Sequence, residues 1–256
     1  MPETPVPPLK RAPIVEAVVD IFCDLPATIN REAFRASAER AFLDRYPKTR
    51  LKFLHEQDIT FGPSKPAASN VRNILEAVQS FSPDNKQIIQ SRPNGFSFNR
   101  LAPYSSFDDY LPEIQRCWNI YCSFALPVRV NRIALRYINR ILVPADDGRA
   151  NLKTYLRSAP NLPEGSDMAL GLTDFLHQYV MFDRPTENQA KLALATQSQG
   201  QEPGFFPIIL DIEAFKIVQI SPQSWTDLVP IMQALRTLKN RLFSHTLTPE
   251  CLKLFQ

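Results

Sequence analysis

The sequence predicts an α+β protein of two similar lobes, each an antiparallel sheet backed by helices on one face. A seven-residue pattern occurs twice, 118 positions apart: 106–112 and 224–230 both read Ser, aromatic, any residue, Asp, any residue, aliphatic, Pro. Each copy has a Ser with an acid three residues later, the spacing typical of a helix N-terminus. The same offset relates the apolar positions of two strand-like runs, Val15, Ala17 and Val19 in the first half and Ile133, Leu135 and Tyr137 in the second. Together these observations indicate a duplicated β-α-β-β-β(-β)-α unit.

The composition is that of an ordinary globular protein and excludes several classes. The chain has 256 residues, of which 44% are apolar and 21% charged. It has 23 prolines and 7 glycines, which favours rigid corners and argues against a dinucleotide-binding fold. A net charge of +3 does not indicate a nucleic-acid binder. There is neither an apolar run of membrane-spanning length nor a signal-peptide core, so we expect a cytoplasmic protein without a membrane segment.

The cysteines and histidines do not predict a metal centre. None of the four cysteines forms a Cys-x-x-Cys pair, and the three histidines are far apart in the sequence. We therefore expect reduced thiols, no structural zinc and no cofactor. Gly-x-Ser-x-Gly, P-loop and His-Glu-x-x-His motifs are also missing from the sequence, so no catalytic residue is predicted.

The first lobe is expected over residues 14–127, after an extended proline-rich arm at 1–13. Alternating apolar residues predict the first strand, and helical spacing predicts a helix that Pro47 ends. Further strands lie between turn signals, and the helix that follows the first Ser-aromatic pattern closes the lobe. The predicted order is strand 14–22, helix 30–46, strand 50–61, a Pro-Ser-Lys-Pro loop, strands 73–81, 86–91 and 95–101, and the helix through 114–122.

The second lobe is expected over residues 128–256 in a similar order. Its elements are strand 128–143, a helical piece at 152–157, strands 170–182, 188–196 and 206–215, and a helix at 224–243. The apolar stripe of that last helix is expected to be buried. We expect both lobes to form one compact domain. Their order resembles the duplicated saddle-like folds of the TATA-binding-protein type, in topology alone.

The candidate site is a row of arginines on the strand 128–143. If its apolar positions face the helices, alternation places Arg132, Arg136 and Arg140 together on the opposite face. The same parity places the acidic residues of two other strands on that face, namely Glu16, Asp20, Asp211 and Glu213. We expect Arg136 to meet Glu16, Asp20 or Asp211. We expect Arg132 and Arg140 to be the more exposed ends of the row.

Several interpretations of this charged face stay open. The arginines and carboxylates can simply form cross-strand ion pairs on a solvated face. They can also form a platform for a protein partner or an anionic ligand, since several guanidinium groups bind phosphate or carboxylate well. The platform predicts a non-catalytic binding or regulatory protein, and dimerisation of the chain is a further option. One alternative is a metal-assisted enzyme that uses the four carboxylates. The other is nucleic-acid binding through the arginines of this strand, Arg129 included, although nucleic acid is not an expected partner.

Several blocks of sequence carry a resemblance to a known family. They are 13–20 (Pro-Ile-Val-Glu-Ala-Val-Val-Asp), 96–104, 135–141 (Leu-Arg-Tyr-Ile-Asn-Arg-Ile), 210–212 (Leu-Asp-Ile) and 238–243 (Leu-Lys-Asn-Arg-Leu-Phe). Across nearly the whole chain they resemble the TIGR04255 family of bacterial proteins of about this length. The resemblance implies no particular reaction. The sporadic distribution of that family is typical of accessory or defence genes, which implies an accessory role.

Overall fold

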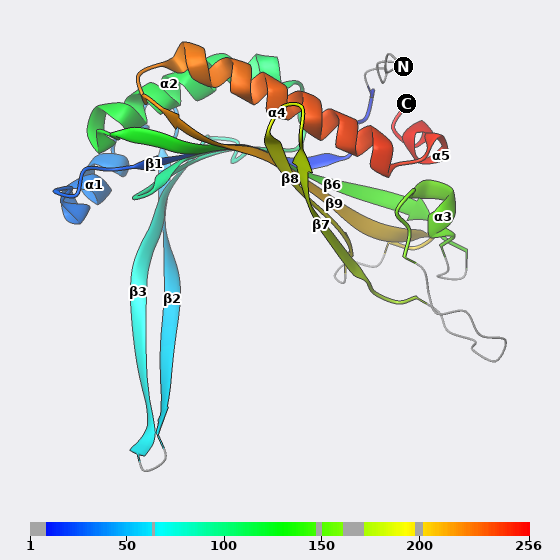
Figure 1. The fold of residues 1–256 in the computed structure, drawn as a ribbon, viewed down its shortest axis with the longest axis horizontal. Helices are drawn as coiled ribbons and strands as arrows, with labels where there is room; N and C mark the ends of the chain where they lie inside the picture. Colours follow the sequence, from blue (N-terminus) through cyan, green and yellow to red (C-terminus); the bar gives the residue numbers. More distant parts are fainter. Residues whose placement is uncertain (1–8, 63–64, 147–149, 161–171, 198–201) are drawn as a thin grey trace.

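One antiparallel sheet organises the protein in the computed structural model, which describes residues 9–62, 65–146, 150–160, 172–197 and 202–256. Nine strands of the described residues form this sheet in the order β2-β3-β4-β5-β1-β6-β9-β8-β7 (Figure 1). The first-half and second-half strands join in the middle, because β1 pairs with β6. The strands are β1 (Ile14–Asp24), β2 (Lys48–Gly62), β3 (Lys65–Phe81), β4 (Gln87–Arg92), β5 (Gly95–Leu101), β6 (Arg129–Pro144), β7 (Leu176–Asp183), β8 (Asn188–Thr196) and β9 (Phe205–Ile220).

Two long helices lie next to each other across one face of the sheet (Figure 1). α4 contacts β6, β8 and β9, and α2 contacts β5. The shorter helices pack at the two ends, with α1 against α2 and α3 against α5. Their bounds are α1 (Arg31–Ala38), α2 (Phe107–Ala125), α3 (Leu152–Tyr155), α4 (Trp225–Thr246) and α5 (Pro249–Lys253). None of the helices in the described ranges is long and apolar enough to cross a membrane.

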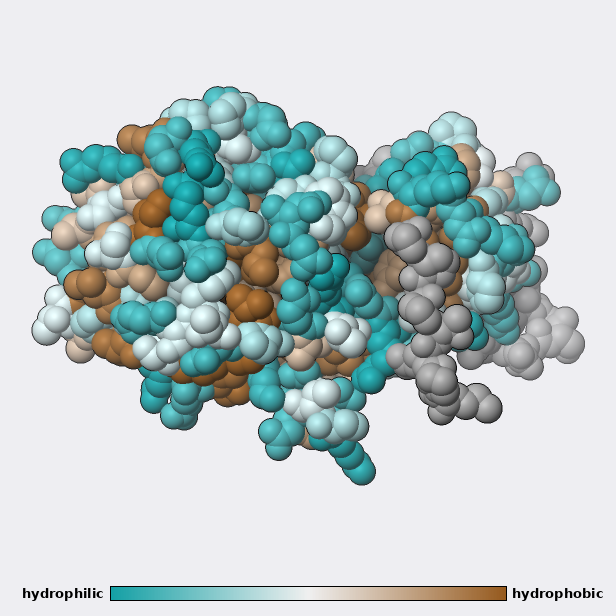
Figure 2. Space-filling model, turned by 90° about the horizontal axis from the view of Figure 1, so that it is seen from above, coloured by the Kyte–Doolittle hydropathy of each residue, from teal (hydrophilic) through white to brown (hydrophobic). Residues whose placement is uncertain are grey.

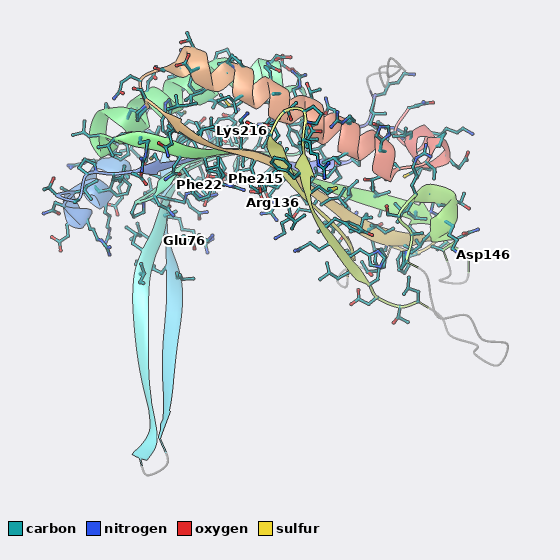
Figure 3. All side chains as sticks on the ribbon, in the orientation of Figure 1. Phe22, Glu76, Arg136, Asp146, Phe215 and Lys216 are labelled. Carbon is teal, nitrogen blue, oxygen red and sulfur yellow. The ribbon has the colours of Figure 1, made fainter. Side chains whose placement is uncertain are left out.

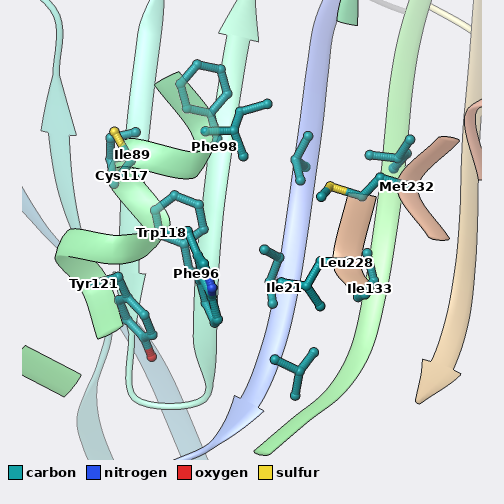
Figure 4. Packing of buried hydrophobic residues seen from close by; sticks show 14 of the residues in the cluster. Ile21, Ile89, Phe96, Phe98, Cys117, Trp118, Tyr121, Ile133, Leu228 and Met232 are labelled. Atoms are coloured by element: carbon teal, nitrogen blue, oxygen red, sulfur yellow. The ribbon is translucent and has the colours of Figure 1, made fainter. Parts of the chain in front are cut away.

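The core fills the space between α2, α4 and the sheet. Trp118 of α2 is fully buried, its ring stacks on Tyr121, and its Nε1 donates a hydrogen bond to the Pro222 carbonyl at 3.0 Å. Figure 4 shows side chains of both halves in this layer, from Ile89 and Phe96 to Leu228 and Met232. Burying each large apolar side chain contributes about 1.5–3 kcal/mol to the stability of the fold. This shared apolar layer, which we call the seam, therefore holds the two halves together.

The predicted elements agree with the structure where apolar periodicity is strong. The mixed α+β class is confirmed, and β5 and β8 have the predicted bounds. The predicted helix 30–46 is shorter, because α1 ends at Ala38 and turns continue to residue 45. The predicted strands in 73–81 and 206–215 are longer, and α5 was not predicted. The arm at 1–8, part of the Pro-Ser-Lys-Pro loop and residues 170–171 of a predicted strand lie outside the described residues.

The two Ser-led patterns start helices in different ways. The Ser106 side chain accepts a hydrogen bond from the Asp109 N–H at 3.2 Å, as a cap should. Ser224 also precedes a helix, as its spacing predicts, but its side chain makes no such bond. Its backbone explains why: Ser224 has ψ 66°, and the Asp227 N–H bonds to the Ser224 carbonyl at 2.9 Å. The first turn of α4 is therefore closed by backbone alone.

The opposite face of the sheet, which we call the lower face, lies between two projecting parts. The β2–β3 hairpin runs down from the sheet at one end, and β7 and β8 slope down at the other (Figure 1). Figure 2 shows the helix side from above, where mostly hydrophilic residues surround smaller hydrophobic areas. The lower face is the surface that carries the arginine row described next.

Candidate binding surface on the lower face

The arginine row lies on the lower face of β6, as alternation predicts. Ile133, Leu135 and Tyr137 are buried toward α2 and α4. The intervening positions point the other way, and Figure 3 shows Arg136 on the underside of the sheet, on the same side as Phe22 and Phe215. β6 therefore separates an apolar side and a charged side by the two-residue period of a strand.

Each predicted arginine has its own acidic partner. Arg136 donates from Nε to Oδ1 of Asp211 at 2.9 Å, and this bond raises the pKa of the Arg136 guanidinium. Arg132 Nη2 donates to Glu213 Oε1 at 2.7 Å. Arg140 donates from Nη2 to Glu202 at 3.0 Å and from Nε to Gln197 at 2.6 Å. The cross-strand ion pairs expected from the sequence thus exist, and most of the charge on this face is compensated.

The carboxylates of β1 are held by the first half of the chain. Asp20 pairs with Arg92 and accepts a hydrogen bond from Ser97 Oγ at 2.8 Å. Glu16 accepts a hydrogen bond from Asn99 Nδ2 at 2.6 Å. Although Glu16 and Asp20 share the face with the arginine row, the structure gives them hydrogen-bond partners on β4 and β5.

The order of exposure along the row differs from the prediction. Arg136, in the middle, has 48% of its side chain exposed, against 19% for Arg132 and 26% for Arg140. Arg132 is covered because its guanidinium lies over the Phe22 and Phe215 rings, 5.1 and 4.2 Å from their centroids. Arg140 is held by Gln197 and Glu202, which accept its hydrogen bonds. The expectation that the ends are the exposed positions is therefore wrong, and the accessible arginine is the central one.

A polar hollow of about 100 Å³ lies beside Arg136. Its lining comes from three adjacent strands, with Arg136 on β6, Asp211 and Glu213 on β9, and Lys191 and Ala193 on β8. Lys191 lies directly across from Glu213 in the β8–β9 ladder. Its side chain is exposed and, within the described residues, forms neither an ion pair nor a hydrogen bond. The hollow thus has one cation without a partner.

Lys191 was not among the site residues predicted from the sequence. Its strand was predicted with the correct bounds, and alternation within 188–196 places Lys191 on a known face. The sequence did not reveal that β8 pairs with β9, and this pairing brings Lys191 next to the acidic residues of β9. That register comes from long-range packing and has no local signal.

The four predicted carboxylates do not gather into one centre. Each is bonded to a different partner, as described above. Among residues 9–62, 65–146, 150–160, 172–197 and 202–256, no three His, Cys, Asp or Glu side chains lie close enough to hold a metal ion. The four cysteines are free thiols, and burial raises the pKa of each of them.

One lysine, Lys239, is buried on the helix side of the sheet, away from the lower face. The side chain of Lys239 on α4 turns inward, and the residue is 9% exposed. Its Nζ lies 3.9 Å from the centroid of the Tyr137 ring, and burial followed by the nearby Arg236 lowers the Lys239 pKa to about 7. Tyr137 in turn hydrogen-bonds Tyr104 through their hydroxyls at 2.9 Å. The sequence does indicate that Lys239 is buried, because it follows Met232 by seven residues and Leu235 by four and so lies on the buried stripe of α4.

No protein-family model and no curated protein matches the chain.

Proposed function

We propose that this protein is a non-catalytic binding protein that uses the lower face of its sheet to hold a protein partner through an acidic group. The observation that carries the proposal is the hollow beside Arg136, with an unpaired lysine at its rim. α2 and α4 lie on the other face, and two projecting parts flank the lower face (Figure 1). A partner can therefore reach the hollow without displacing a helix.

The charges around the hollow favour one extra negative group. Arg132 and Arg136 are matched by Glu213 and Asp211, while Lys191 is unmatched. Arg136 uses Nε and Nη2 for Asp211, which leaves Nη1 available. A carboxylate placed between Arg136 Nη1 and Lys191 Nζ gains charge-assisted hydrogen bonds and separates no existing ion pair. This supports a binding role beyond simple cross-strand pairing.

The alternatives have less support from the same residues. Nucleic-acid binding needs guanidinium groups free to neutralise phosphates, and the row has a carboxylate for each arginine. A metal-assisted reaction needs several ligands within coordination distance, and the carboxylates of the lower face are bonded separately.

A retention experiment with matched charge reversals tests the proposal. Wild-type protein, Lys191→Glu and Lys153→Glu are immobilised, and proteins retained from a nuclease-treated extract of the native host are quantified by mass spectrometry. Lys153 is the control because it is also an exposed lysine, on α3, without an ion pair in the described structure. We expect a partner that binds wild type and Lys153→Glu and is lost with Lys191→Glu.

Equal retention by all three proteins would remove the lower face from the function. Retention that appears only in a parallel extract without nuclease, and that falls steeply with salt, would favour the nucleic-acid alternative. Stoichiometric metal in protein purified without chelator would favour the enzyme alternative.

We also propose that the two halves descend from one duplicated unit, with lobes over 14–127 and 128–256. The strand order from the middle of the sheet supports this, since it runs β1-β5-β4-β3-β2 on one side and β6-β9-β8-β7 on the other. Val18 lies opposite Arg136, and these positions are 136 − 18 = 118 residues apart, the offset of the Ser-led patterns. Superposing β1 to α2 on β6 to α4 tests the idea, and a misfit of α2 and α4 by more than a strand spacing of about 4.8 Å would refute it.

Membership of the TIGR04255 family, a cytoplasmic location and an accessory or defence-associated role complete the proposal. The family and the role rest on sequence blocks such as 13–20 and 135–141, and the location rests on the apolar runs of the sequence, none of which has membrane-spanning length.

A further inference from the structure

The outer edge of β7 is an unprotected pairing edge. β7 is the last strand of the sheet and pairs with β8 alone in the described part of the chain. Leu176, Val180 and Phe182 are largely exposed, the first two at 69% each. From Leu176 to Phe182 the strand has no Lys, Arg, Asp, Glu or Pro. Sheet edges are normally blunted by such residues, and an edge without them readily accepts another strand.

The opposite edge has that protection. β2 begins with Lys48, Arg50 and Lys52, and Lys52 pairs with Glu76 of β3 at 2.8 Å. The two ends of one sheet therefore differ, and β7 is the end suited to pairing.

The backbone of β7 determines which residues face outward. The Phe175 carbonyl accepts from the Thr196 N–H at 3.1 Å, and the Phe175 N–H donates to Thr196 Oγ1 at 2.8 Å, so Phe175 bonds inward to β8. Inward and outward groups alternate along a strand, and the β7–β8 ladder has no register shift. The N–H and C=O groups of Leu176, Gln178, Val180 and Phe182 therefore point outward.

We propose that β7 pairs antiparallel with β7 of a second copy of this chain, about a two-fold axis at Tyr179. This register places Leu176 against Phe182 of the partner subunit and Gln178 against Val180 of the partner subunit. Both are pairs of outward-facing residues, and such pairs exchange two hydrogen bonds each. The apolar side chains that the two β7 strands carry on the lower face then contact each other across the subunit interface.

Charge selects a second copy as the occupant. In this register Asp174, two residues before β7, comes to the same end of the paired strands as Arg184 of the partner subunit, the first residue after β7. The two-fold axis repeats the pair at the other end, since 174 + 184 equals twice 179. Asp174 and Arg184 are both exposed and, in the described ranges, have no ion pair within their own subunit. They are free to pair between subunits.

Sedimentation velocity over a wide concentration range tests the pairing. Wild type is expected to shift from monomer to dimer. Gln178→Pro removes an outward N–H and spares the bonds to β8, so it should keep the fold and lose the dimer. Circular dichroism and thermal unfolding confirm the fold of each variant.

Charge reversal tests the register and does not depend on how proline is tolerated. Asp174→Arg and Arg184→Asp each oppose like charges at both ends, and each should raise the dimer dissociation constant about tenfold. The double variant Asp174→Arg/Arg184→Asp restores opposite charges and should recover the wild-type constant. A wild type that stays monomeric throughout, a dimer unaffected by Gln178→Pro, or a double variant as weak as the singles would overturn the proposal.

Discussion

Replacing Lys239 by Met should change how the stability of the protein depends on pH. Lys239 is 9% exposed, and burial lowers its pKa from 10.5 to about 7. In the unfolded chain the amine binds a proton below pH 10.5, whereas in the folded protein it stays neutral down to about pH 7. Between these values the unfolded state binds more protons, so the free energy of unfolding falls as the pH is lowered.

The magnitude follows from the two pKa values. Each pH unit inside the window changes the free energy of unfolding by about 1.4 kcal/mol. From pH 9 to pH 7, wild type should lose about 2 kcal/mol relative to Lys239→Met, after allowance for the flattening near the folded pKa. The Tyr137 ring beneath the amine attracts the charged form and reduces this difference. Arg236, which Asp108 holds at 2.8 Å, acts in the opposite direction.

Urea titrations of both proteins at pH 7, 8 and 9, followed by circular dichroism, measure this difference. All other titrating groups are common to the two proteins and cancel in the comparison. We expect Lys239→Met to be the more stable protein at pH 7 and its advantage to shrink at pH 9. Stability curves that stay parallel across this range would mean that the buried amine remains charged, paired through the Tyr137 ring alone.

Two further predictions concern packing. Trp118→Ala and Leu235→Ala should each lower the free energy of unfolding by about 2–5 kcal/mol in urea titrations, because both side chains are fully buried. Exposed Ile217→Ala should change it by less than about 0.5 kcal/mol, and equal losses for all three would mean that the seam is not the core. Gly95→Ala should cost more than about 2 kcal/mol, since Gly95 has φ +153° and an added Cβ would lie 2.4 Å from the Ile21 carbonyl oxygen. An unchanged melting temperature for Gly95→Ala would contradict that contact.

The sequence predicts the elements whose local pattern matches their burial. β1 and β6 alternate cleanly, and their paired faces appear as expected in the structure. The β2–β3 hairpin was underestimated because polar residues such as Asn70 and Asn73 do not alternate with apolar ones, although the backbone pairs through them. α5 escaped prediction because five residues are too few for a periodic signal.

The candidate site shows the same division. Strand parity correctly assigned Arg136 to the lower face, since parity is a local property. The partner of Arg140 could not be found this way, because Glu202 lies outside any strand. Lys191 and the cover over Arg132 depend on which strands are neighbours, and one sequence carries no direct record of that order.

The burial of Trp118 gives the protein its own optical probe. The chain has two tryptophans, and the indole of Trp118 lies at the seam where it joins α2 to the carbonyl of Pro222 in the other half. Its emission wavelength and quenching by iodide therefore report on water entering between the halves. The β2–β3 hairpin and β7 have no tryptophan, so loosening at either end of the sheet leaves this fluorescence unchanged while amide hydrogen exchange detects it. Comparing the two signals on one sample would show whether the seam opens together with the outer strands or after them.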